Sequence, residues 1–335
     1  MKKNIALLTG GYSGEFEISA ESGQVVYNHI DKNLFNVYKI VIGVKNWVYQ
    51  ATDGNEYAIN LDDFSILLPS GKVIFDAAFI AIHGTPGEDG KLQGYLDMMG
   101  IPYNTCGRAT SAITFNKFFS DGLARAYKVN TARTVYLHKR DIPDVEAILQ
   151  VTGLPCFVKP NSNGSSVGIS KVKTSEELLT AIALAFEADA EVLVQEFIPG
   201  VEITCGIYEK EGQLISLPLT EIIPKNEFFD YEAKYKGKSE EITPARISPE
   251  LANECTGLSL DLYRKFNCRG IVRFDYILTP EGFSKGSRYY FLEVNTIPGL
   301  TEASIVPQQA ANIGISLSQL FTDVLNETIN FYRES

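Results

Sequence analysis

Two short segments near the end of the chain carry polar side chains at every second position. Arg273 and Asp275 are two residues apart, and Phe291, Glu293 and Asn295 follow the same spacing. In a β-strand, residues two apart project from the same face of the sheet. If the two segments pair as neighbouring strands, the oxygen-bearing side chains of Asp275, Glu293 and Asn295 converge on one face.

An oxygen cluster of this kind has a defined chemistry. Carboxylate and amide oxygens without cysteine or histidine are ligands for magnesium or manganese rather than zinc. Carboxylates that point inward from two strands are costly unless a cation neutralises them. The spacing therefore predicts a magnesium or manganese site at Asp275, Glu293 and Asn295, and the alternative is a solvated face of a sheet.

A second candidate site is the glycine-rich segment 157–168. Lys159 ends a predicted strand, and glycine and serine residues follow it, among them Ser165. Backbone N–H groups in such a loop can cradle phosphate oxygens while the ammonium adds positive charge. The segment lacks the Gly-Lys-Ser/Thr ending of a Walker A loop. Alone it is typical of an ordinary hairpin, but beside a metal site it predicts polyphosphate binding.

Two loops in the first hundred residues also carry candidate groups. Glu15 lies where a predicted strand meets a helix, which suits a substrate ammonium; a plain charge at a helix N-terminus is the alternative. The loop before it lacks Gly-x-Gly-x-x-Gly, so a dinucleotide fold is not indicated. His83 opens the loop 83–90 after a predicted strand, where α/β sheets place ligands. A structural histidine is the alternative there.

The segment 192–198 is a candidate hinge for an adenine ring. Its backbone groups can hydrogen-bond the edge of the base, and its apolar side chains can enclose the ring. The segment alone favours the alternative, which is a plain strand of the core.

The composition limits the class of protein. Of 335 residues, 45% are hydrophobic and 21% are charged, as in an ordinary soluble globular protein, and the net charge is −11. That charge argues against nucleic-acid binding, which needs a basic surface. The five cysteines form no C-x-x-C pair and indicate buried thiols in a reducing compartment. No apolar run approaches the roughly 20 residues of a spanning helix, so a cytoplasmic protein without a membrane partner is expected.

The elements that position these groups are expected to form three domains. In the first, strands at 5–8, 35–42 and 73–82 alternate with helices at 17–30 and 92–99, and this βαβ rhythm predicts a parallel sheet. A helix at 114–127 and strands at 156–159 and 169–172 then predict a small α+β lobe, and strands at 191–198, 202–208, 270–278 and 289–295 predict a larger one. The expected domains are 1–105, 106–190 and 191–335.

Six segments carry a resemblance to a known family. They are Gly-Gly-x-Ser-x-Glu at 10–15, His-Gly-x-x-Gly-Glu-Asp-Gly at 83–90, Lys-Pro-x-x-x-Gly-Ser-Ser-x-Gly at 159–168, Asp-Tyr-Glu-Ala-Lys-Tyr at 230–235, Arg-x-Asp at 273–275 and Glu-x-Asn-x-x-Pro-Gly at 293–299. In this order they resemble the ATP-grasp ligases, in particular the D-alanine–D-alanine ligases, from end to end. The resemblance implies an ATP-grasp fold, α/β and α+β, with an N-terminal parallel α/β (pre-ATP-grasp) domain that binds substrate.

The resemblance implies roles for residues around ATP and its metals. Glu202 would contact the ribose, and Asp275, Glu293 and Asn295 would hold two magnesium or manganese ions, with Glu293 bridging them. The residues implied to contact ATP phosphates are Lys117, Lys159 and Lys234. Those implied around adenine are Gln195, Glu196, Phe197 and Ile198.

The resemblance also implies roles in binding two D-alanine molecules. Glu15, helped by the His83 loop, would bind the ammonium of the first. Arg273 and the Gly299 N–H would stabilise the tetrahedral oxyanion. The remaining implied roles are a hydrogen-bonded link between Glu15 and Tyr235 through Ser165, and a carboxylate site at Ser304 and the Ile305 amide.

The implied reaction joins two D-alanine molecules through an acyl phosphate for peptidoglycan precursor synthesis, in an enzyme expected to be a homodimer. One departure from the family is Gln195, where relatives often carry an acidic residue; its amide oxygen can still accept the adenine amino hydrogen. A ligase that joins D-alanine to D-lactate or D-serine is an alternative. Tyr235 argues against the D-lactate ligase. A non-catalytic ATP-binding module and a biotin-carboxylase-like enzyme are further alternatives.

Overall fold

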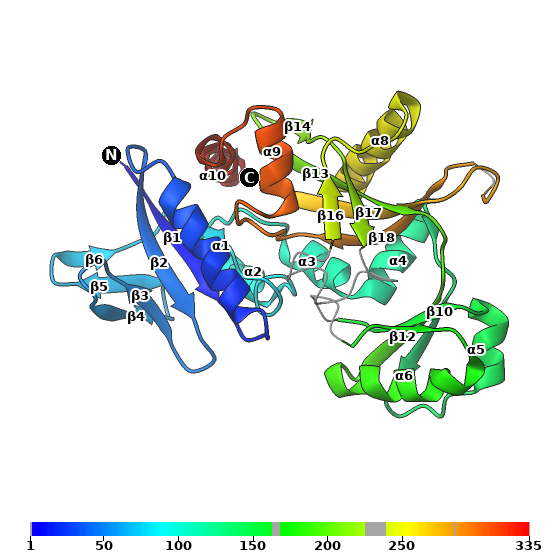
Figure 1. The fold of residues 1–335 in the computed structure, drawn as a ribbon. Helices are drawn as coiled ribbons and strands as arrows, with labels where there is room; N and C mark the ends of the chain where they lie inside the picture. Colours follow the sequence, from blue (N-terminus) through cyan, green and yellow to red (C-terminus); the bar gives the residue numbers. More distant parts are fainter. Residues whose placement is uncertain (1, 163–167, 225–238, 285, 335) are drawn as a thin grey trace.

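The chain forms three sheets (Figure 1). The computed structural model describes residues 2–162, 168–224, 239–284 and 286–334. The N-terminal and C-terminal sheets each have seven strands, and the central sheet has four. Within the described ranges, no helix combines the length and hydrophobicity needed to cross a bilayer.

The N-terminal sheet has the strand order β6-β5-β4-β3-β2-β1-β7. Its centre, β1 (Lys3–Gly10), runs parallel to β2 (Phe35–Ile42) and β7 (Ala77–Ile80), because helix α1 (Phe16–His29) carries the chain back between β1 and β2. The expected parallel sheet is confirmed for these strands, although the strand predicted at 73–82 is shorter. The other strands pair antiparallel and are β3 (Trp47–Gln50), β4 (Glu56–Asn60), β5 (Ser65–Leu68) and β6 (Gly71–Val73).

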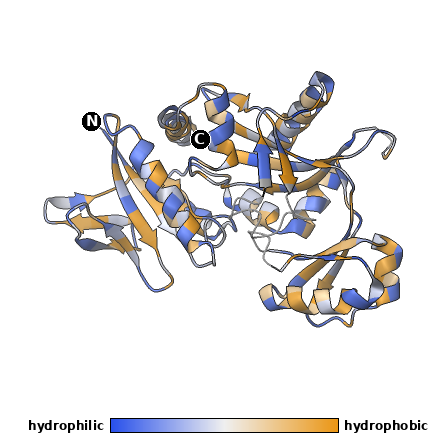
Figure 2. Cartoon of the chain, in the orientation of Figure 1, coloured by the Kyte–Doolittle hydropathy of each residue, from blue (hydrophilic) through white to orange (hydrophobic). Residues whose placement is uncertain are grey.

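Both faces of β1 are buried. Leu7 packs in a cluster with Phe321 of α10 (Leu317–Glu334), and Leu8 packs on the other side in a cluster that includes residues of α2 (Lys91–Met99). A strand covered on both faces is hydrophobic without alternation. Figure 2 accordingly shows β1 and β2 largely in the colour of hydrophobic residues.

The central sheet is antiparallel, with the order β11-β10-β12-β9. Its strands are β9 (Thr134–His138), β10 (Cys156–Pro160), β11 (Ser170–Val172) and β12 (Glu191–Glu196). Val158 and Val194 face a hydrophobic cluster with helices α5 (Val145–Thr152) and α6 (Ser175–Ala188). By the alternation of strands, Lys159 therefore lies on the opposite face of this sheet.

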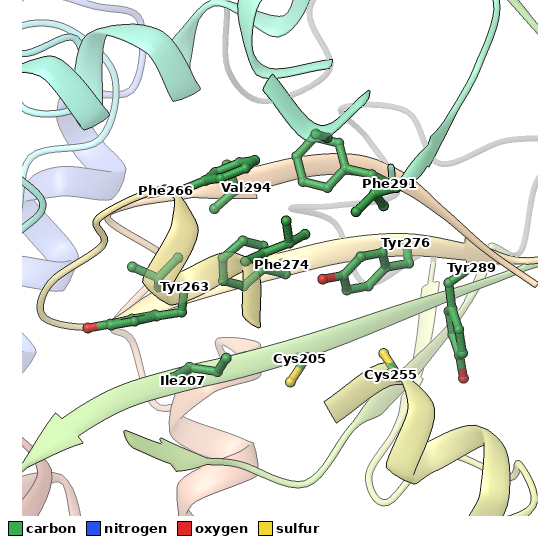
Figure 3. Packing of buried hydrophobic residues seen from close by; sticks show 14 of the residues in the cluster. Cys205, Ile207, Cys255, Tyr263, Phe266, Phe274, Tyr276, Tyr289, Phe291 and Val294 are labelled. Carbon is green, nitrogen blue, oxygen red and sulfur yellow. The ribbon is translucent and has the colours of Figure 1, made fainter. Parts of the chain in front are cut away.

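The C-terminal sheet has the order β16-β15-β13-β17-β18-β8, and β14 also pairs with β13. Its strands are β8 (Asn130–Thr131), β13 (Val201–Lys210), β14 (Gln213–Ser216), β15 (Thr220–Pro224), β16 (Ser239–Ile242), β17 (Val272–Leu278) and β18 (Tyr289–Asn295). Its helices are α3 (Arg108–Phe115), α4 (Lys117–Ala126), α8 (Pro249–Lys265) and α9 (Ile305–Asn312). One face packs on α8 through a cluster rich in aromatic rings (Figure 3).

The hydrogen bonding suggests different domain boundaries from those predicted. Strand β12 pairs with β9 and β10, although it was expected to begin the last domain. Helices α3 and α4 contact β18, and Asn116 separates them where one helix was predicted at 114–127. The Asn116 Oδ1 atom accepts a hydrogen bond from the Phe119 N–H at 3.0 Å and caps α4. We propose that the central lobe runs from about β9 to β12.

A β-bulge corrects one prediction about the strand pair β17–β18. Asp275 lies opposite Glu293, but its neighbour Tyr276 lies opposite Phe291, so Leu292 is an extra residue without a partner. One extra residue reverses the faces beyond it, since side chains alternate along a strand. Phe291 therefore packs in the aromatic cluster with Tyr276, not on the face of Glu293 as predicted (Figure 3).

Candidate active site

Four polar residues meet on the face of β17 and β18 opposite the aromatic cluster. Arg273 donates from Nε to Asp275 Oδ1 at 2.9 Å and from Nη2 to Oδ2 at 2.8 Å. Asn295 donates from Nδ2 to Asp275 Oδ2 at 2.9 Å, and Glu293 is the cross-strand neighbour of Asp275. We call Arg273, Asp275, Glu293 and Asn295 the strand-pair cluster. The predicted convergence of the three oxygen-bearing residues is confirmed.

The strand-pair cluster is buried and holds opposite charges in contact. Arg273 is 8% exposed and Asp275 is 1% exposed. Burial disfavours the charge of Arg273, but Asp275, followed by Glu293 and Glu202, outweighs it, so the guanidinium pKa is raised above its ordinary value. A bidentate arginine–carboxylate pair is among the strongest hydrogen-bonded pairs in proteins. Arg273 therefore stays charged and fixed in place.

The strand-pair cluster has a donor set that fits magnesium or manganese. Its oxygens come from two carboxylates and one amide, and these hard donors suit those ions. The Asn295 Nδ2 group faces Asp275, so the Asn295 amide oxygen faces away from Asp275 and is able to act as a ligand. Within the described ranges, no group of three or more His, Cys, Asp or Glu side chains is placed to hold a metal. The strand-pair cluster has only two such side chains, and its third oxygen donor is the Asn295 amide.

Two lysines stand near the strand-pair cluster. Lys117, at the start of α4, places Nζ 3.9 Å from Oε2 of Glu293. Lys159, on β10, is 6% exposed, and its ammonium forms no ion pair within the described part of the chain. Burial lowers the Lys159 pKa, Asp121 opposes this, and Lys117 lowers it further. A polyphosphate would offset the cost of holding this buried positive charge.

Sequence reasoning missed Asp121, which lies on α4 against the central sheet. The Gln195 Nε2 group donates to Asp121 Oδ2 at 2.6 Å and to Thr134 Oγ1 at 2.9 Å. Burial raises the Asp121 pKa to about 6, although Lys159 and the hydrogen bond from Gln195 oppose it. The contact joins residues 74 apart in the sequence, so only the fold reveals it. We call Lys117, Asp121, Lys159 and Gln195 the lysine face.

The rest of the predicted adenine hinge is placed as follows. Glu196 is occupied by Arg133, whose Nε donates to Oε2 at 2.6 Å and whose backbone N–H donates to Oε1 at 2.8 Å. The Phe197 ring centroid lies 6.0 Å from that of Phe157, and Lys171 Nζ lies 4.3 Å from the Phe197 centroid. The side chain of Glu196 is therefore committed to protein contacts, whereas Phe197 offers an aromatic wall.

Two predicted residues of the adenine and ribose region have fewer defined contacts. Ile198 is half-buried and follows the end of β12. Glu202 lies on β13 opposite Ile277 of β17, and its charge acts on Arg273. Glu202 thus belongs to the same charged surroundings as the strand-pair cluster.

Glu15 lies beside Gly84 in the loop that His83 opens, near the ends of β1 and β7. An ideal Cβ atom on Gly84 would lie 2.8 Å from Glu15 Oε2, and the φ of 68° at this position also favours glycine. His83 is buried, with Nε2 2.9 Å from Ser22 Oγ and Nδ1 3.0 Å from the carbonyl oxygen of Ile297. Since a carbonyl only accepts, Nδ1 carries the proton. His83 thereby ties α1 to the segment that precedes Gly299.

The predicted residues after β18 form one compact turn. Ser304 precedes α9, and its Oγ atom lies 2.7 Å from Thr301 Oγ1. An ideal Cβ atom on Gly299 would lie 2.6 Å from Ser304 Oγ, so a larger residue there would require the Ser304 side chain to shift. Ile305 is the first residue of α9, and its N–H is among those that a helix leaves free at its N-terminus. The predicted residues Ser165, Lys234 and Tyr235 lie outside the described residues.

Known proteins are similar to this chain over most of its length. Family profiles described as "D-ala D-ala ligase N-terminus" and "D-ala D-ala ligase C-terminus" match residues 4–106 and 122–326. A D-alanine–D-alanine ligase of Azobacteroides pseudotrichonymphae is 46% identical over 325 residues, which is 96% of this chain and 99% of that protein.

Solved structures of ligases share the fold. The structure of the D-alanine–D-alanine ligase from Coxiella burnetii has a TM-score of 0.87 at 26% identity, covering 99% of this chain and 95% of that one. The VanG D-Ala:D-Ser ligase from Enterococcus faecalis has a TM-score of 0.85 at 32% identity, covering 97% of this chain and 99% of that one. The predicted ATP-grasp fold is thus confirmed. The chain belongs to the D-alanine–D-alanine ligase family.

Proposed function

We propose that the chain uses ATP to join two D-alanine molecules into D-alanyl-D-alanine, a step of peptidoglycan precursor synthesis. The observation that carries the proposal is the buried Arg273–Asp275 pair with Lys117 beside Glu293. It places fixed positive charge beside a set of metal-binding oxygens, as transfer of a phosphoryl group onto a carboxylate requires.

The first step forms an acyl phosphate. The carboxylate oxygen of one D-alanine attacks the γ-phosphorus of ATP, and the bond from phosphorus to the β-phosphate oxygen breaks to release ADP. Lys117 and Lys159 neutralise the charge of the phosphates. Lys234, which lies outside the described residues, is proposed to share this role. Glu15 holds the ammonium of this D-alanine beside the His83 loop.

The second step forms the peptide bond. The amine of the other D-alanine attacks the acyl carbon, loses a proton, and phosphate leaves. Arg273 uses Nε and Nη2 on Asp275, so Nη1 is left to donate to the oxyanion together with the Gly299 N–H. Ser304 and the Ile305 N–H bind the carboxylate of the attacking molecule. Ser165 and Tyr235 are proposed to order this site.

Asp275, Glu293 and Asn295 are proposed to hold two magnesium or manganese ions. Bound there, the ions would supply positive charge that neutralises the phosphates of ATP. The adenine is proposed to be surrounded by Gln195, Glu196, Phe197 and Ile198. Glu202 is proposed to contact the ribose. A cytoplasmic location and a homodimer remain predictions from the sequence.

A ligase for a different second substrate is a competing function, because the VanG relative is described as a D-Ala:D-Ser ligase. Product analysis of the enzyme with D-alanine, alone and with D-serine or D-lactate, distinguishes the two functions. Under the proposed function D-alanyl-D-alanine is the main product in every mixture. A dominant mixed product would assign the chain to the competing function.

The central experiment is ADP release in the presence and absence of D-alanine, in wild type and Arg273→Ala. D-alanine-dependent release should fall on the order of 10²- to 10³-fold in the variant, since one oxyanion donor is worth that much. Arg264→Ala, on the exposed side of α8, is the matched control and should behave as wild type. ADP release that ignores D-alanine would indicate a different ATP-binding function, and an unaffected Arg273→Ala would refute the oxyanion role.

A further inference from the structure

The side-chain amide of Gln195 is held by two neighbours that both contact its nitrogen. Nε2 lies 2.6 Å from Oδ2 of Asp121 on α4 and 2.9 Å from Oγ1 of Thr134 on β9. Gln195 is 6% exposed and Asp121 is 3% exposed, so water competes weakly for these contacts. The amide is therefore clamped between a helix and the central sheet.

Both neighbours can only accept the hydrogen bond. An ionised carboxylate has no proton to donate, and the single hydroxyl proton of Thr134 is directed to the carbonyl oxygen of Ala132 at 3.1 Å. If the Gln195 amide were reversed, its oxygen would face two acceptors and the hydrogen bonds would be lost. Asp121 and Thr134 together therefore fix the orientation of the Gln195 amide, with its nitrogen toward them and its oxygen away.

The consequence is a fixed acceptor on the lysine face. With both N–H groups of Gln195 engaged, the group left for a ligand is Oε1. A purine base with an amino group at position 6 can donate to such an oxygen, as adenine does. Guanine carries an oxygen there and would leave two acceptors facing each other.

We propose that Asp121 is a positioning residue that makes the enzyme choose ATP over GTP, by holding the Gln195 amide with its oxygen toward the base. This inference rests on the proposed function, in which ATP is the phosphoryl donor and Gln195 lies at the adenine. It also accounts for an amide rather than a carboxylate at position 195. A carboxylate at position 195 would lie against that of Asp121, and like charges at that distance repel.

The first experiment compares the KM for ATP and for GTP, at saturating D-alanine, in wild type and three variants. Asp121→Ala and Asp121→Asn free the amide to turn over, and Thr134→Val removes the other acceptor with little change of shape. Each should lower the KM ratio of GTP to ATP, by about tenfold for the Asp121 variants and less for Thr134→Val. The KM for D-alanine should stay unchanged, which a general structural defect would not allow.

A second experiment places a carboxylate beside Asp121 and then removes the charge of Asp121. Gln195→Glu alone should raise the KM for ATP at least tenfold, because it sets two carboxylates together. Adding Asp121→Asn should restore that KM to within about threefold of wild type, because an amide can donate to the new carboxylate. Rescue by a second substitution is a result that disruption of packing does not produce.

The matched control is Asp144→Asn at the cap of α5, on the opposite face of the central sheet. It should leave both KM values unchanged. An unchanged GTP to ATP ratio in Asp121→Asn or Thr134→Val, or failure of the double variant to recover, would overturn the inference. Those results require wild type to be active with D-alanine and ATP, and an inactive wild type would instead contradict the proposed function.

Discussion

Two groups of buried charges flank the candidate site, and the protein holds them differently. In the strand-pair cluster, Arg273 and Asp275 satisfy each other through two hydrogen bonds, and the arginine pKa is raised. In the lysine face, burial lowers the Lys159 pKa and raises that of Asp121 to about 6. The first group is neutralised within the protein, whereas the second carries an electrostatic cost that a bound polyphosphate would relieve. Under the proposed function, the first group stabilises the fold and the second gives up stability for binding.

The largest expected effect concerns the strand-pair cluster. Arg273→Leu should lower the free energy of unfolding by about 3–5 kcal/mol, because it leaves the buried Asp275 carboxylate without a positively charged partner. Adding Asp275→Leu should recover most of this loss. Urea denaturation measures both. The exposed Lys265–Asp261 pair gives the control, since Lys265→Leu should cost less than about 1 kcal/mol. A double variant as unstable as the sum of its parts would contradict internal neutralisation.

A smaller effect is expected from the pH dependence of the Asp121 carboxyl. Its folded pKa of about 6 lies above the ordinary 3.8, so the folded chain binds the extra proton between those values. Its contribution to stability is therefore present at low pH and lost as pH rises through this window, by about 3 kcal/mol. Asp121→Asn should remove this loss, so its stability relative to wild type should improve from pH 4 to 7. For the Asp144→Asn control, the difference in stability from wild type should be the same at pH 4 and pH 7. The same constant difference in Asp121→Asn would show that the pKa of the Asp121 carboxyl is not perturbed.

The third prediction concerns Lys159 of the lysine face. Lys159→Met should raise the KM for ATP on the order of a hundredfold, as loss of a buried electrostatic contact to phosphate does. Without ATP the variant should be at least as stable as wild type, because burial disfavours the charge that it removes. Steady-state kinetics and thermal unfolding measure the two effects, and the exposed Lys139→Met is the control. A destabilised variant with unchanged KM would place Lys159 among the structural charges.

The sequence predicts local features of this site well because they depend on alternation. Asp275, Glu293 and Asn295 meet on one face, as residues two apart on paired strands must. The prediction fails for Phe291, because nothing in a single strand reveals that its partner carries one residue fewer. The predicted boundary at 190 has a related origin: it places β12 in the last domain, whereas β12 pairs with β9 and β10. Alternation shows which face is buried, not which strand lies alongside.

Contacts between distant elements were beyond the sequence. Asp121 in α4 looks like one more surface acid until the fold brings Gln195 against it. The bonds of His83 to Ser22 and Ile297 likewise join three separate parts of the chain. Motifs identify residues that touch ligands, but a residue that acts through another side chain has no motif of its own.

The packing of α10 against β1 affects how the chain folds while it is being made. Leu7 and Phe321 share one cluster, although 314 positions separate them. Ribosomes add about 5–20 residues per second, so that stretch takes roughly 15 to 60 seconds to synthesise. Throughout that interval one apolar side of β1 packs on α1 alone and lacks the part of its cover that α10 supplies. The N-terminal domain therefore emerges early but closes its core late, and the nascent chain is most open to chaperones and to aggregation before α10 arrives.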